Sequence, residues 1–104
     1  MTEQASQLTQ ALIKQVEQLS SLAVLLEKEL QLISSRDAES LMNLLDEKTA
    51  LLTSIQALDG SIERTISDQG SMSEEDEALM ANAKKLLDDC KYRTQVNQKA
   101  VEQG

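Results

Sequence analysis

The sequence predicts an all-α protein, an elongated antiparallel three-helix bundle of long helices, and three observations support this prediction. Forty per cent of the residues are apolar, and almost all of these are Leu, Ile, Val, Ala or Met, while Leu, Ala and Met together with Glu, Gln and Lys favour helices. The 104 residues include no proline, three glycines and one tyrosine as the only aromatic, which argues against a compact all-β domain. Three segments repeat their apolar residues in steps of four and three, the pattern of helices packed lengthwise. The length fits one domain, residues 1–104.

The first predicted helix covers about residues 4–34. Its apolar residues follow one another in uninterrupted steps of four and three, which places them in one stripe. The stripe consists of Leu12, Val16, Leu19, Ala23, Leu26, Leu30 and Ile33. Further apolar residues widen it, namely Leu22, Val24, Leu25 and Leu32. An apolar surface of this width indicates contact with two neighbouring helices.

The second predicted helix covers about residues 38–67 and follows a short polar turn, residues 34–37. Ser35 or Asp37 can cap its amino end, and so short a connection forces the two helices to run antiparallel. Lys48 and Asp59 are expected at the edge of its seam. Gly60 weakens a helix, but the apolar phase continues past it, so we expect one helix. The expected seam is Leu41, Leu45, Lys48, Leu52, Ile55, Asp59, Ile62 and Ile66, widened by Leu44, Leu51 and Leu58.

The third helix is expected over about residues 74–103, after a loop at residues 67–73. Gly70 suits a positive φ in this loop, and Ser73 with Asp76 has the spacing of a capping box. The stripe of the helix is Leu79, Ala83, Leu86, Cys90, Arg93, Asn97 and Ala100. Because polar residues enter the stripe after Cys90, we expect this half to fray or to dock on another molecule.

The composition excludes most catalytic and metal chemistry. The sequence has no histidine and one cysteine, so an imidazole base, a His or four-thiolate zinc site and an internal disulfide are all excluded. Cys90 is expected to be a small buried apolar residue, and the acidic run Glu74–Glu77 is expected to complement a helix dipole. We therefore expect no enzyme activity, no cofactor and no metal site.

Charge and hydropathy limit the classes of partner. A net charge of −8 argues against nucleic acid as a ligand, because phosphate contacts need clustered Lys and Arg. The longest apolar run, Leu22–Leu26, has five residues, far fewer than a membrane-spanning helix needs, so we expect no membrane insertion. The start, Met1–Gln4, lacks the basic flank of a secretory signal, which favours a cytoplasmic location.

The turn and the second predicted helix resemble the FlgN family, the flagellar export chaperones of the hook-associated proteins. The resemblance begins at Ser35–Leu41 and continues through a helix of the family's form Leu-x-x-Leu-Leu-x-Glu-Lys-x-x-Leu-Leu. Asn97 near the end of the third helix also resembles the asparagine-bearing last segment of the family. The residues that match the helical form are Leu41, Leu44, Leu45, Glu47, Lys48, Leu51 and Leu52.

The resemblance implies a chaperone that binds the terminal helices of hook-associated flagellar subunits and keeps them soluble before type III export. Members of the family usually continue for a few tens of residues past the position of Gly104 and bind their partners in that region. We therefore expect that the C-terminal continuation present in the family is missing from this chain. The partner contacts expected within the chain are Val96, Asn97, Ala100 and Val101. The alternative is a self-associating structural coiled-coil module, a homo-oligomer without a client.

Overall fold

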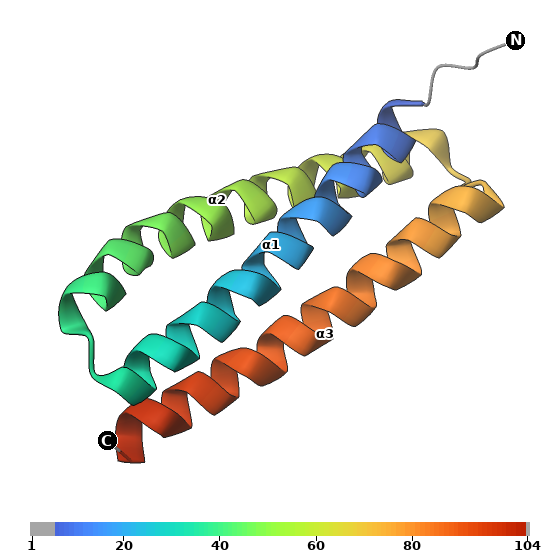
Figure 1. Ribbon diagram of the computed structural model, residues 1–104. Helices are drawn as coiled ribbons and strands as arrows, with labels where there is room; N and C mark the ends of the chain where they lie inside the picture. The colour runs from blue at the N-terminus through green and yellow to red at the C-terminus, as the bar shows by residue number, and fades with distance from the viewer. Residues whose placement is uncertain (1–5, 104) are drawn as a thin grey trace, which may run out of the picture.

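The computed structural model describes residues 6–103 and consists of three long helices (Figure 1). They are α1 (Gln7–Ser35), α2 (Ala38–Gln69) and α3 (Glu74–Gln103). α2 runs antiparallel to α1 and α3, and the principal extents of 52 × 25 × 21 Å describe a rod. The all-α, elongated three-helix bundle predicted from the sequence is confirmed. The expected start of the first helix near Gln4 lies outside the described residues.

α1 is the central helix of the bundle. It packs against both α2 and α3, whereas among residues 6–103 no Cα atom of α2 lies within 8 Å of a Cα atom of α3. Figure 1 shows α1 running between the other two helices. The wide apolar surface predicted for the first segment accounts for this position, because one helix must cover two neighbours.

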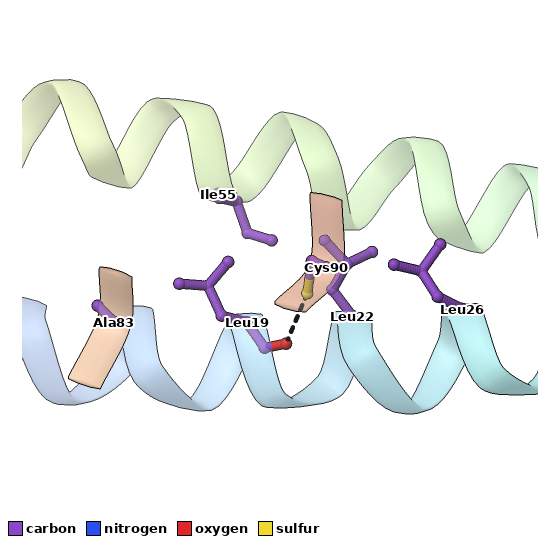
Figure 2. Packing of buried hydrophobic residues seen from close by; sticks show 6 residues of the cluster. All are labelled: Leu19, Leu22, Leu26, Ile55, Ala83 and Cys90. Carbon is purple, nitrogen blue, oxygen red and sulfur yellow. Dashed lines mark hydrogen bonds between the residues drawn. The ribbon is translucent and has the colours of Figure 1, made fainter. Parts of the chain in front are cut away.

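The core consists of two clusters of buried apolar side chains. The central cluster is drawn in Figure 2 and combines Leu19, Leu22 and Leu26 of α1 with Ile55 of α2 and with Ala83 and Cys90 of α3. The second cluster, toward the start of the described chain, contains Leu8, Leu12 and Ile62. α1 supplies five of the nine members of these clusters, so its leucine stripe positions both other helices.

The turn between α1 and α2 is fixed by caps at both helix ends. The backbone N–H groups of Arg36 and Asp37 donate to the carbonyl oxygens of Ile33 and Leu32, each at 3.1 Å, which forms a Schellman motif. Arg36 takes the left-handed conformation that this motif requires, with φ 59°. Asp37 then accepts hydrogen bonds from the backbone N–H and the hydroxyl of Ser40, at 3.1 and 2.8 Å. Of the two candidate caps, Asp37 is therefore the residue that begins α2.

The connection between α2 and α3 uses the glycine and the serine that the sequence singled out. Gly70 has φ 78° and donates its N–H to the carbonyl oxygen of Ile66 at 2.9 Å, which ends α2. The hydroxyl of Ser73 accepts from the backbone N–H of Asp76 at 3.1 Å and caps α3. The carboxylate of Asp76 accepts a hydrogen bond from the Thr9 hydroxyl of α1. The first bond of the predicted capping box is thus present, while the Asp76 side chain links α3 to α1.

The predicted seam of α2 is wrong at two positions. Leu45 is 56% exposed and Leu52 is 37% exposed, whereas Leu44 is buried and Leu51 packs against the central cluster. The physical reason is that α2 packs closely on α1 and not on α3, so only the part of its wide apolar stripe on the α1 side is covered. The helix continues through Gly60 without interruption.

Candidate partner-binding groove between α2 and α3

α3 contacts α1 through one row of buried residues spaced by seven. The row consists of Asp76, Ala83, Cys90 and Asn97. Asp76 accepts from the Thr9 hydroxyl at 2.6 Å, and the Cys90 thiol donates to the carbonyl oxygen of Leu19 at 3.5 Å. Small side chains in this row let the backbones of α1 and α3 approach closely. The same row leaves most of the α3 surface without a neighbouring helix.

Glu29 of α1 joins all three helices. Its carboxylate accepts hydrogen bonds from the ammonium of Lys48 on α2 at 3.1 Å and from the side-chain amide of Asn97 on α3 at 2.7 Å. The side chains of Glu29 and Lys48 are 16% and 21% exposed, so this ion pair is largely shielded from water. We call these three residues the Glu29 clasp. The clasp holds the half of α3 that carries polar residues in its stripe.

A groove runs over α1 between α2 and α3, and two hollows mark its course. The hollow near the carboxyl end of α3 has a volume of about 480 Å³ and is lined by Glu29, Lys48 and Val101, among others. The hollow toward the start of α3 has a volume of about 140 Å³ and lies between Asp59 of α2 and Leu87 of α3. Each hollow is lined by all three helices, so α1 forms the floor of the groove and the other two helices form its rims.

The rims carry apolar side chains that are exposed to water. On α3 these are Met80, Leu87 and Val101, which are spaced by multiples of seven and therefore share one face. On α2 they are Leu45 and Leu52, three positions before and four after Lys48, and hence on the groove side of α2. We call these five the rim residues. Exposed apolar side chains gathered along one groove are typical of an interaction site.

The four residues expected to contact a partner do not share one surface. Val101 lies at the groove, whereas Val96 lines a separate crevice beside Tyr92 on the other side of α3. Asn97 is 5% exposed and points inward, where it donates to Leu26 and Glu29, and Ala100 is half-buried. Asn97 is therefore part of the packing while α3 is docked. A partner role for these residues stays a prediction, and Val101 is the one that reaches the groove with a largely exposed side chain.

Sequence reasoning missed four of the five rim residues. The regular four-three steps of α2 predict an interior position for Leu45 and Leu52. A signal for the α3 rim was present in the sequence, since Met80, Leu87 and Val101 form a heptad row beside the buried row of Ala83, Cys90 and Asn97. Two parallel rows on one helix indicate two neighbours, and within residues 6–103 only α1 packs closely against α3.

The single thiol has no features of a nucleophile. Burial raises the pKa of Cys90, and the nearby Asp89 carboxylate raises it further, while the Arg93 guanidinium acts in the opposite direction. Arg93 itself pairs with Asp89 at 2.8 Å. The thiol therefore stays protonated and donates to the Leu19 carbonyl oxygen (Figure 2), which agrees with a small buried residue of the core.

The helices and the whole sequence can be compared with known proteins. No helix within residues 6–103 combines the length and the apolar character needed to cross a membrane. Neither the curated proteins nor the solved structures contain a match to the chain. The protein family described as FlgN protein matches residues 1–104, which is the whole sequence. Together with the three-helix bundle and the resemblance in the turn and α2, this match shows that the chain belongs to the FlgN family of flagellar export chaperones.

Proposed function

We propose that the chain is a cytoplasmic export chaperone that binds the terminal helices of hook-associated flagellar subunits before type III export. Membership of the FlgN family supports the chaperone role. The observation that carries client binding is the open side of α3. Among residues 6–103 this helix packs closely on α1 and not on α2, and it leaves Met80, Leu87 and Val101 exposed. An apolar row that none of the three described helices covers is suited to hold the apolar stripe of a partner helix.

The proposed mechanism is reversible burial. Terminal helices that assemble into a filament carry apolar stripes, which aggregate if they are exposed before assembly. A chaperone that covers such a stripe keeps the subunit soluble and then releases it without chemistry. Release requires a moderate affinity, and a groove floor that is polar at the Glu29 clasp favours this because less apolar area is buried there.

Calorimetric titration with peptides of about 40 terminal residues from the hook-associated proteins tests this function. We expect binding with a dissociation constant in the micromolar range or tighter, together with a gain in helical circular dichroism as the peptide orders. The matched control is a peptide of the same composition with its apolar residues moved off the stripe, which should not bind. Absence of binding by every terminal peptide overturns the proposal.

Self-association is the competing function, because Leu45 and Leu52 also leave an apolar surface open on α2. Light scattering over a hundredfold concentration range separates the two. A mass that stays at one chain throughout excludes the self-associating module. An oligomer that dissociates when a terminal peptide is added indicates that client and copy compete for one surface.

A further inference from the structure

We propose that the groove between α2 and α3 holds one amphipathic helix of the partner, and that the flank of this helix facing α3 carries acidic residues. The inference rests on the proposed function and adds where the partner lies and which side chains it presents. With the partner helix in place, the three helices of the chain become a four-helix arrangement over the stripe of α1.

The groove is long enough for a single helix to lie along it. α1 forms its floor. The two rims are separated at the backbone level, since no described Cα atom of α2 lies within 8 Å of one of α3. The stretch of α3 from Met80 to Val101 spans about 30 Å at the rise of an α-helix, which matches an occupant of about 20 residues. Hollows toward both ends of this stretch leave space for side chains that enter from above.

The apolar spacing on the rims also specifies a helix. Leu45 and Leu52 on α2 are seven residues apart, as are Met80 and Leu87 on α3. Rows with a period of seven interdigitate with a helix whose own apolar residues repeat in the same way, and not with an extended strand. Leu19 and Ile33 of α1 add apolar floor between the rims.

Charge on the α3 rim identifies one flank of the occupant. Lys84 lines the groove beside Leu87, and Lys91 follows Leu87 by four positions on the same side of α3. Neither lysine forms an ion pair with any residue in 6–103. Asp59 of α2 lines the same hollow as Lys84 without pairing with it, and residues 49–57 of α2 carry no charge. Two unpaired ammonium groups one heptad apart favour acidic residues on the side of the occupant that faces α3.

The net charge of the chain and the concave shape of the groove disfavour a second copy of the chain as the occupant. Each copy carries a net charge of −8, so two copies repel one another at low ionic strength. In addition, two concave grooves placed face to face leave the floor of each unfilled, whereas one inserted helix fills it.

Two double variants test whether the partner helix binds in the groove. Leu45→Glu with Leu87→Glu places one charge on each rim, and Val24→Glu with Tyr92→Glu places two charges at exposed apolar positions outside the groove. Titration uses the terminal peptides of the hook-associated proteins, and circular dichroism checks that helicity is retained. We expect the rim variant to bind at least tenfold more weakly and the control variant to stay within twofold. Equal affinities of the two variants overturn the groove.

A second pair tests the flank and does not depend on the apolar positions. Lys84→Glu with Lys91→Glu and Lys85→Glu with Lys99→Glu change the net charge by the same amount at exposed lysines, and only the first pair borders the groove. We expect the first pair to weaken binding at least fivefold more than the second, with a smaller difference at high salt. Equal effects of the two pairs overturn the acidic flank.

The remaining outcomes separate this inference from the proposed function. Failure of the unaltered chain to bind any terminal peptide overturns both. Normal peptide binding by both rim and control variants overturns the groove and leaves the chaperone function standing. If the unaltered chain forms a dimer that Leu45→Glu with Leu87→Glu abolishes, and peptides do not compete with this dimer, the occupant is a second copy and the inference is overturned.

Discussion

The side-chain amide of Asn97 donates a hydrogen bond of 2.9 Å to the backbone carbonyl oxygen of Leu26, one heptad after the Cys90 thiol donates to that of Leu19. Both carbonyl oxygens belong to the interior of α1 and accept through their second lone pair, beside their helical hydrogen bond. Sliding α3 along α1 by one residue would leave the buried Asn97 amide without these acceptors. The two bonds therefore fix the register of α3, and with it the position of the groove rim.

Replacing Asn97 by alanine should lower the stability of the bundle. The variant loses two hydrogen bonds at a buried site, to Leu26 and to Glu29, and we expect a loss of about 1–2 kcal/mol in the free energy of unfolding. Urea unfolding followed by circular dichroism measures it. Gln98→Ala, at the exposed neighbouring position, should change the stability by less than about 0.5 kcal/mol. Equal stabilities of the two variants contradict a register role for Asn97.

The hydrogen bond between Thr9 and Asp76 should couple the first turns of α1 and α3. Because the acceptor is a buried carboxyl group, we expect Thr9→Val to cost about 1.5–3 kcal/mol. A double-mutant cycle of Thr9→Val with Asp76→Ala should return a coupling energy of at least about 1 kcal/mol. Thr53→Val is the control, since the Thr53 hydroxyl donates only within α2 and is exposed. Additive effects of Thr9→Val and Asp76→Ala would refute the coupling.

The sequence predicts the three helices and their caps because these depend on local residues. The four-three steps around Leu19 and the turn signals at Asp37 and Gly70 are each readable within a few positions. The covered side of α2 is not local. Leu45 and Leu52 continue the seam as regularly as Ile55 does, and they are exposed because α3 packs closely on α1 and its backbone stays away from α2.

The hydrogen-bond partners of Asn97 also could not be predicted from the sequence. Its place in the stripe of α3 predicts that it faces inward, and it does. Its acceptors Leu26 and Glu29 lie about 70 residues earlier in the chain, and no pattern near either of them marks a polar contact. Register between parallel helices is a tertiary property, so the Glu29 clasp could be found only from the structure.

The Cys90 thiol should report whether α3 stays docked. Its burial and raised pKa both suppress the thiolate that reacts with disulfide reagents. We expect labelling of the folded chain near neutral pH to be at least about a hundredfold slower than labelling in denaturant, because it requires local opening. Stopped-flow absorbance with an aromatic disulfide reagent measures both rates. A folded chain that reacts as fast as the unfolded one would show that α3 detaches readily.

The Asp37 cap should make stability depend on pH in a defined direction. Hydrogen bonds from the backbone N–H and then from the hydroxyl of Ser40 lower the pKa of Asp37 below its ordinary value of 3.8. A carboxyl group with a lowered folded pKa stabilises the fold above its unfolded pKa, and this contribution is lost as the pH falls through the folded pKa. The unaltered chain should therefore exceed Asp37→Asn in urea midpoint at pH 6, and the difference should shrink as the pH falls past 3.8 and disappear only below the lower folded pKa.

A variant of Ser40 provides a further check on this pH dependence. Ser40→Ala removes the hydroxyl donor but keeps the backbone donor, so its pH-dependent difference from Asp37→Asn should be smaller than that of the unaltered chain but not zero. A difference between the unaltered chain and Asp37→Asn that is constant from pH 6 to the acid limit would contradict titration of this cap.

Arg36 should be a site where a substitution stabilises the bundle. Its φ of 59° lies in the left-handed region, where a side chain with a Cβ atom is strained and glycine is not. Glycine is also the residue that the Schellman motif at the end of α1 prefers, so Arg36→Gly should raise the free energy of unfolding by about 0.5–1 kcal/mol. Ser34→Gly is the control inside the last turn of α1, where glycine should instead lower stability by up to about 1 kcal/mol. Thermal unfolding of the two variants measures these changes in stability, which should have opposite signs although the positions are two residues apart. A loss of stability in Arg36→Gly would show that the arginine side chain contributes more to stability than its backbone conformation costs.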